Sequence, residues 1–153
     1  MRVVLDTNVW LSSIFWEGEA YQLLKTLEKK EIEILITEEI LLEVSQVLIR
    51  EAKFQKFITN KRIVVEDLLK TIVVRSKIIV PKRNVAIVKE DPADDRILEC
   101  AVNGNGNYIL SYDAHLLKLK EFEGIKIIKP KRFLKGNKIK ILRYKPLNKT
   151  SFQ

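Results

Sequence analysis

The amino-acid sequence predicts an α/β fold with a central parallel sheet. Short apolar runs alternate along the chain with longer segments of helical periodicity, and the first run, Arg2–Leu5, is apolar without alternation, as expected of a strand buried on both faces. Such alternation predicts βαβ units joined by right-handed crossovers. With 153 residues, 46% of them hydrophobic, the chain is long enough for one domain with a core and short for two.

The first half of the chain contains two strands and two helices. The first strand ends at Asp6–Asn8, where the chain turns. Leucines at helical spacing predict a helix over Ala20–Lys30, and the apolar run Ile32–Ile36 predicts the second strand. Thr37 is a good N-cap residue and acids follow it, so we predict a helix over Thr37–Arg50.

The second half repeats this alternation. An amphipathic segment predicts a helix over Val65–Lys77, and Ile78–Val80 follows as a short strand that Pro81 ends. The next helix is predicted over Pro92–Val102, because its apolar residues form a stripe and a glycine cluster stops it. Tyr108–Leu110 is then predicted to form a strand.

The last elements of the core are a helix that opens with Leu116 and Leu117 and a strand over Ile125–Ile128. The sequence shows no internal repeat. We therefore assign residues 1–134 to one globular domain and residues 135–153 to a basic C-terminal tail.

The net positive charge of the chain is concentrated at its C-terminal end. The formal charge is +8, and Lys129–Gln153 contains nine Lys or Arg residues and no acid, so the remainder has 19 basic and 20 acidic residues. Lys and Arg that neutralise phosphates release counterions, so this end fits a polyanionic partner. A solvated terminus, or an extra edge strand over Ile139–Leu142, is the alternative.

Composition excludes several kinds of site. The only cysteine, Cys100, cannot form an internal disulfide, and with a single histidine, His115, it cannot complete a structural zinc site. No Ser-His-Asp or Cys-His set is available for nucleophilic catalysis. The N-terminus shows neither a signal peptide nor a membrane-spanning segment, so we expect a cytoplasmic protein in which oxygen atoms hold any metal.

Two acids stand directly after predicted strands. In open parallel sheets ligands bind outside the carboxyl ends of the strands, and Asp6 and Asp113 follow buried strands at such ends. We expect both side chains to point into one crevice. For either residue alone, a role as a helix N-cap would explain the same position.

Two further acids lie on predicted helices. Glu43 borders the buried face of its helix, where a carboxylate is costly unless it is compensated; a salt bridge with Arg50 or Arg62 would compensate it. Asp94 lies in a helical first turn, where the helix dipole also favours acids. Several carboxylates in one crevice repel one another unless a cation neutralises them. Magnesium or manganese fits this oxygen set, and either can activate water for attack on a phosphodiester.

Four separated segments resemble PIN domains in order and spacing: Val4–Val9, Glu43 in the second-strand helix, Asp91–Ala101 and Ile109–Leu117. The closing segment Ile127–Leu134 resembles the group of PIN domains that are toxins of toxin-antitoxin systems. The resemblance covers about residues 1–134. The basic tail lies outside it and inherits nothing from it.

The resemblance implies a three-layer α/β/α sandwich, a magnesium- or manganese-dependent ribonuclease that hydrolyses single-stranded RNA, and frequent homodimers. It also implies a metal site. Asp94 is the expected third ligand of this site, and the adjacent Asp95 is the alternative. By motif, the metal-holding and catalytic residues are Asp6, Glu43, Asp94 and Asp113, and the residues that orient them are Asn8 and Ser111.

Other functions stay open at this stage. Aspartyl-nucleophile phosphatases also place Asp after a first strand, but they need a second Asp two residues later, where this chain has Asn8. An RNA- or protein-binding domain without turnover is another alternative. Within the nuclease hypothesis, the chain would be a toxin held by an antitoxin protein or a housekeeping RNA-processing enzyme. The apolar cluster Trp10–Trp16 would belong to the core, to a dimer seam or to a partner's site.

Overall fold

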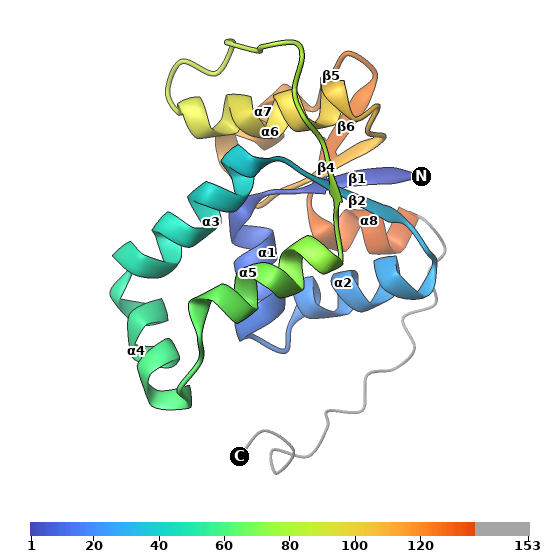
Figure 1. The fold of residues 1–153 in the computed structure, drawn as a ribbon. Coiled ribbons are helices and arrows are strands. Elements are labelled where there is room, and N and C mark those ends of the chain that lie inside the picture. The colour runs from blue at the N-terminus through green and yellow to red at the C-terminus, as the bar shows by residue number, and fades with distance from the viewer. Residues whose placement is uncertain (137–153) are drawn as a thin grey trace.

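The structure is a computed structural model that describes residues 1–136 (Figure 1). Its strands are β1 (Arg2–Leu5), β2 (Glu33–Ile36), β3 (Lys77–Ile78), β4 (Tyr108–Leu110), β5 (Glu121–Phe122) and β6 (Ile125–Ile128). Its helices are α1 (Thr7–Phe15), α2 (Glu19–Lys29), α3 (Glu38–Arg50), α4 (Ala52–Lys61), α5 (Val65–Val74), α6 (Pro92–Asn103), α7 (Ala114–Leu119) and α8 (Pro130–Gly136).

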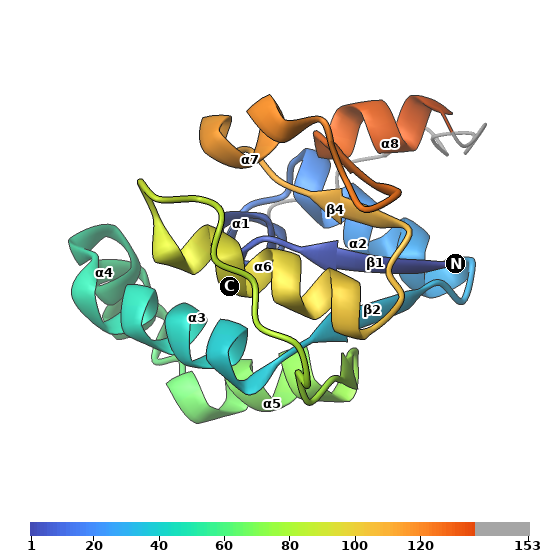
Figure 2. The same cartoon turned by 90° about the horizontal axis from the view of Figure 1, so that it is seen from above.

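The strands form one sheet in the order β3-β2-β1-β4-β6-β5. All neighbouring strands pair in parallel except β5 and β6, which form an antiparallel hairpin. The two residues of the hairpin turn, Glu123 and Gly124, both have positive φ. Helices α6 and α7 lie on one side of the sheet and α1, α2 and α8 on the other (Figures 1 and 2). The predicted three-layer α/β/α fold is confirmed, and the hairpin is the exception to its parallel sheet.

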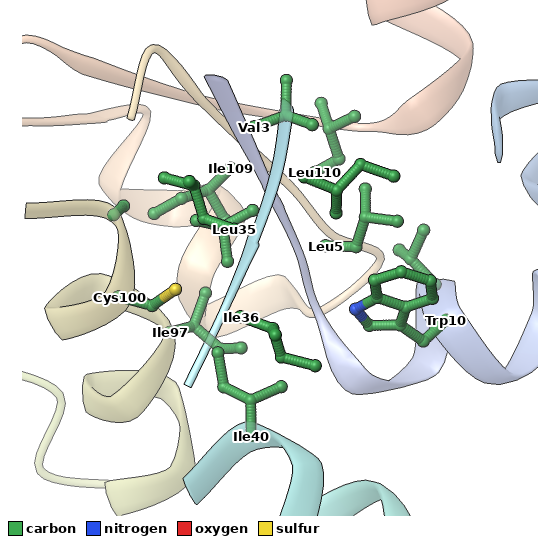
Figure 3. Packing of buried hydrophobic residues seen from close by; sticks show 14 of the residues in the cluster. Val3, Leu5, Trp10, Leu35, Ile36, Ile40, Ile97, Cys100, Ile109 and Leu110 are labelled. Carbon is green, nitrogen blue, oxygen red and sulfur yellow. The ribbon is translucent and has the colours of Figure 1, made fainter. Parts of the chain in front are cut away.

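The core surrounds β1, the strand that was expected to be buried on both faces. Val3, Val4 and Leu5 are fully buried, and β1 pairs with β2 on one side and with β4 on the other. Figure 3 shows side chains of these strands packed against Ile97 and Cys100 of α6. Burial on this scale supplies the main stabilisation of such a domain.

Helix α1 begins where the sequence indicated only a turn. The side chain of Asp6 accepts a hydrogen bond from the backbone N–H of Thr7 and caps the helix. Within the aromatic cluster, Trp10 is fully buried and Phe15 nearly so, while Trp16 is 47% exposed. Most of this cluster therefore belongs to the core, and Trp16 is its exposed end.

Two other elements differ from expectation. Helix α4 was not predicted, because Phe54 is its only buried residue and its sequence carries little apolar periodicity. Strand β3 begins one residue before the predicted strand and is shorter. Ile79 still donates a hydrogen bond to the carbonyl of Ile36, and the pairing ends there because β2 also ends at Ile36, just before α3.

Helix α8 is the last element that the structure describes. Helix α8 continues through Gly136, two residues beyond the expected end at Leu134. The rest of the basic tail, including the alternative edge strand over Ile139–Leu142, lies outside the described residues. None of the helices in residues 1–136 combines the length and the apolar composition that a membrane crossing requires.

Candidate metal centre

The central strands bring two acids together. Leu5 at the end of β1 is paired with Leu110 at the end of β4, and the N–H of Asp6 donates to the carbonyl of Leu110 at 3.0 Å. Asp6 follows β1 directly, and Asp113 follows β4 after two residues. Both acids therefore leave the sheet at the carboxyl ends of adjacent parallel strands, where ligands of such sheets bind.

Ser111 links these two acids. Its hydroxyl donates to Oδ2 of Asp6 at 2.6 Å and accepts from the N–H of Asp113 at 2.9 Å, and the residue is fully buried. Burial raises the pKa of Asp6 to about 6, although hydrogen bonds from Ser111 and Thr7 lower it, and the charges of nearby acids raise it further. Ser111 therefore orients Asp6 and favours its charged form.

Glu43 reaches the same region from α3. The hydroxyl of Thr7 donates to Oε2 of Glu43 at 3.0 Å, so the hydrogen-bond partner of this acid is a neighbour of Asp6. In residues 1–136 neither Arg50 nor Arg62 forms an ion pair with Glu43, although the charge of Arg50 lowers its pKa. Glu43 is half-buried, and burial raises its pKa. Thr7 thus connects the first turn of α1 to the carboxylate on α3.

The beginning of α6 supplies two more acids. Asp91 caps this helix by accepting from the N–H of Ala93 at 3.0 Å. Carboxylate oxygens of Asp91, Asp94 and Asp113, one from each, lie within 4.8 Å of one another. Asp94 is 4% exposed, and its buried Oδ2 has no hydrogen-bond partner. Burial raises the pKa of Asp94 to about 7, and the charges of the four other acids raise it too. The five acids are one electrostatic group.

Asp94 and Asp95 are adjacent but face different surroundings. Oδ1 of Asp95 accepts from the N–H groups of Ile87 and Val88, at 3.0 and 2.9 Å, in the segment before α6. Asp94 lies among the carboxylates and keeps an unpartnered oxygen. Of the two residues between which the sequence left the third ligand open, Asp94 is the one that the fold brings to the other acids.

The remaining site residues divide into those predicted and those missed. Asn8 is exposed, and in residues 1–136 no hydrogen bond joins its side chain to a carboxylate. Thr7 was missed as the residue that contacts Glu43, and a helix starting at Thr7 was the signal that could have found it. Asp91 was not among the predicted site residues, whereas it is both a cap and a member of the cluster.

This donor set fits a hard divalent cation. Within residues 1–136 no Lys or Arg forms an ion pair with any of the five carboxylates, and Arg50 acts on Glu43 only through its charge at longer range. A bound cation would offset the mutual repulsion of the carboxylates. Magnesium and manganese bind oxygen ligands of this kind. The unpartnered Oδ2 of Asp94 is a buried oxygen without the hydrogen bond that such atoms normally have.

Comparisons with known proteins agree with this architecture. The family model of the PIN domain matches residues 2–115. No curated protein matches the chain. Among solved structures, a chain in the crystal structure of VapBC2 from Rickettsia felis, bound to a DNA fragment from their promoter, has a similar fold. It is 17% identical, the match covers 83% of this chain and 97% of that chain, and the TM-score is 0.58.

Proposed function

This chain belongs to the PIN-domain family, and from that premise we propose that it is a metal-dependent endoribonuclease that hydrolyses phosphodiester bonds of single-stranded RNA. PIN domains are generally nucleases, which supports a hydrolase. The observation that carries the proposal is the group of five carboxylates that form no ion pair with a Lys or Arg of residues 1–136, in which Oδ2 of Asp94 is buried and unpartnered.

Each acid has a place in this proposal. Asp6, Glu43, Asp94 and Asp113 would hold magnesium or manganese, and Asp91 would add a fifth carboxylate beside Asp94 and Asp113. When bound, the cation supplies Lewis-acid stabilisation of charge on the phosphate and activates water for attack. The chain contributes orientation: Ser111 fixes Asp6, and Thr7 fixes Glu43.

For the cellular role, we propose a toxin of a toxin-antitoxin module, with a cognate antitoxin protein as partner and a homodimer or higher homo-oligomer as the assembly. The similarity in fold to a chain of the VapBC2 complex supports this role. Exposed apolar side chains such as Leu42, Ile49 and Val74 offer surface for protein partners. A housekeeping RNA-processing nuclease, or a PIN domain that binds RNA or protein without turnover, remains the alternative.

The proposal is tested with purified full-length chain and an end-labelled single-stranded RNA. Cleavage is expected with Mg²⁺ or Mn²⁺ and not with excess chelator. Asp94→Asn, purified in parallel, is the matched control because it changes the side chain very little in volume and removes a charge. Equal cleavage by both preparations would identify a contaminating ribonuclease. Metal binding without cleavage would favour the binding-domain alternative.

A further inference from the structure

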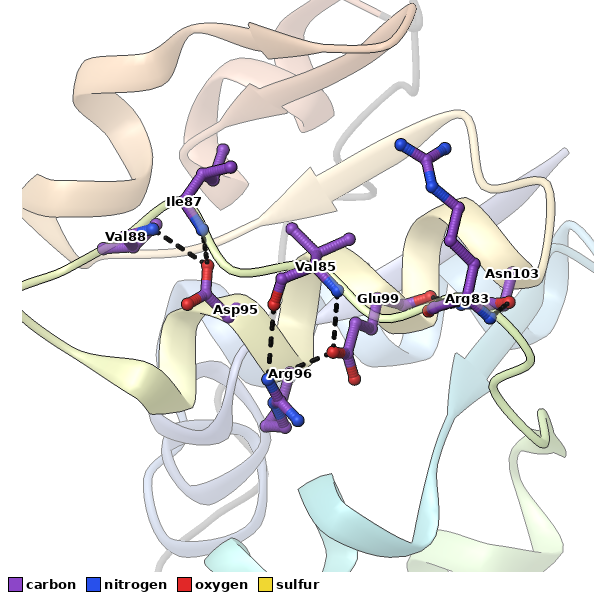
Figure 4. A network of polar contacts seen from close by, with 8 residues as sticks. All are labelled: Arg83, Val85, Ile87, Val88, Asp95, Arg96, Glu99 and Asn103. Carbon is purple, nitrogen blue, oxygen red and sulfur yellow. Dashed lines mark hydrogen bonds and ion pairs between the residues drawn. The ribbon is translucent and has the colours of Figure 1, made fainter.

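One face of α6 holds the backbone of the segment that precedes it. Asp95, Glu99 and Asn103 are spaced four residues apart, so they lie along one side of the helix. The segment of residues 82–88, which we call the strap, lies beside them. Figure 4 shows the strap extended along α6, with polar side chains of the helix directed at its backbone.

The contacts form a ladder. At the far end, Oδ1 of Asn103 accepts from the N–H groups of Lys82 and Arg83, both at 2.9 Å. In the middle, Oε1 of Glu99 accepts from the N–H of Val85 at 2.9 Å. At the end nearest the carboxylates, Asp95 accepts from the two consecutive N–H groups of residues 87 and 88. The strap therefore runs antiparallel to α6.

Asp95 bears the least compensated charge of this ladder. Asp95 and Glu99 are 6% and 3% exposed, and Glu99 has an ion pair with Arg96 at 3.0 Å. In the described part of the chain no cation pairs with Asp95, so the backbone N–H groups that it accepts from are what compensate it. Buried carboxylates are retained only where hydrogen bonds of this kind offset their desolvation.

The clamped end of the strap leads directly to the carboxylate cluster. Val88 is buried against the core, and after a turn at Lys89 and Glu90 the chain reaches Asp91. Asp91 is held from the other side by its cap bond to Ala93. The backbone at Asp91 is thus fixed between two anchors, one of which is Asp95.

We propose that Asp95 is a positioning residue of the metal centre: by clamping the strap at Ile87 and Val88, it keeps the carboxylate of Asp91 beside Asp94 and Asp113. This inference rests on the proposed function. It assigns different tasks to neighbouring acids, since Asp94 would contact the cation and Asp95 holds the loop that brings Asp91 beside it.

The test is a double-mutant cycle on Mn²⁺ affinity, measured by calorimetry with the full chain. Asp95→Ala should weaken Mn²⁺ binding about 10- to 100-fold, the range found for residues that orient metal ligands. Asp91→Asn keeps an N-cap oxygen and removes the charged ligand. If Asp95 acts through Asp91, the Asp91→Asn/Asp95→Ala chain should bind Mn²⁺ with the same affinity as Asp91→Asn. The charged ligand that Asp95 positions is already absent in Asp91→Asn, so loss of Asp95 should have no further effect on Mn²⁺ affinity.

Two controls separate positioning from general loss of stability. Asn103→Ala releases the far end of the same strap, so the unfolding free energy of this variant should fall. Its Mn²⁺ affinity should stay within about twofold of the wild type, because distant sites are expected to act independently. Asp95→Asn keeps an oxygen that can accept the two backbone hydrogen bonds but removes the charge, so it should weaken Mn²⁺ binding less than Asp95→Ala. If Asp95→Ala does not fold, Asp95→Asn replaces it in the double-mutant cycle.

The outcomes are distinguishable. Faster hydrogen exchange at the amides of residues 87 and 88 in Asp95→Ala, with weaker Mn²⁺ binding that depends on Asp91, supports the inference. Unchanged Mn²⁺ affinity, or an equal loss in the presence of Asp91→Asn, overturns it. Failure of the wild-type chain to bind Mn²⁺ contradicts the proposed function itself.

Discussion

The hydroxyl of Ser111 donates a 2.6 Å hydrogen bond to the carboxylate of Asp6, although the two residues are 105 positions apart in the sequence. Both are buried, and the same hydroxyl accepts from the N–H of Asp113. A single side chain thereby joins the ends of the two central strands.

Ser111→Ala should destabilise the fold by about 1–3 kcal/mol, because a buried carboxylate loses its side-chain donor. It should also raise the pKa of Asp6 further, since this hydrogen bond lowers it. Urea unfolding measures the first effect. The control is Ser45→Ala, whose hydroxyl bonds to the carbonyl of Leu42 on the surface and should matter little. Equal losses in the two variants would contradict a special role for Ser111.

Asp94→Asn and Asp95→Asn should give opposite phenotypes. Asp94→Asn should abolish RNA cleavage and Mn²⁺ binding, yet stabilise the metal-free chain, because it removes one of five repelling charges. Asp95→Asn should retain most of the cleavage. Cleavage rates and unfolding free energies, measured side by side for the two variants and the wild type, check these expectations. An inactive Asp95→Asn beside an active Asp94→Asn would reverse the assignment.

Divalent cations should stabilise the native chain. A ligand that binds only the native state adds about 2.7 kcal/mol to the unfolding free energy when its concentration is 100 times Kd. Millimolar Mn²⁺ or Mg²⁺ should therefore raise the Tm of the wild type, and the shift should disappear in Asp6→Asn. Identical melting curves for both chains, with and without chelator, would contradict metal binding at this site.

The metal-free chain should become more stable on acidification from pH 7.5 to 5.5. The pKa of Asp6 is raised from 3.8 to about 6 and that of Asp94 to about 7, so the native state keeps protons that the unfolded state has lost. This stabilisation is complete below pH 4 and is lost as pH rises through 6 to 7, with an upper limit of about 3 kcal/mol for Asp6. Urea unfolding in chelator checks the slope. Asp94→Asn should flatten it, and a slope unchanged in that variant would contradict the assignment.

The basic tail gives a further prediction about RNA. Beyond Gly136 the sequence contains five Lys or Arg residues and no acid. If all five contacted phosphates of a single strand, they would contribute at most about −3.5 to the slope of log affinity against log salt. A chain ending at Gly136, which retains all of α8, should show a shallower slope when binding is measured in Ca²⁺. Identical slopes for both chains would exclude RNA binding by the tail.

The sequence predicted the sheet and helices best where periodicity was strong, and the site only in part. Asp6 and Asp113 each follow a buried strand, a local pattern. Which strands lie next to each other is a non-local property that the sequence does not show. The choice between Asp94 and Asp95 depends on the strap, whose irregular backbone has no periodic signal. Thr7 was missed because Asp6 suits both a turn and a helix cap.

Three of the five carboxylates also cap helices: Asp6 caps α1, Asp91 caps α6 and Asp113 caps α7. Loss of a cap costs about 1 kcal/mol, and Asn keeps the capping oxygen that Ala lacks. If the chain is the toxin proposed above, selection for variants that no longer harm the host would recover two kinds of escape mutant at the same codons. Replacement by Asn would leave a folded chain at normal abundance, which could still occupy an antitoxin. Replacement by Ala or a larger apolar residue would also weaken a helix start, and cellular proteases would clear that chain.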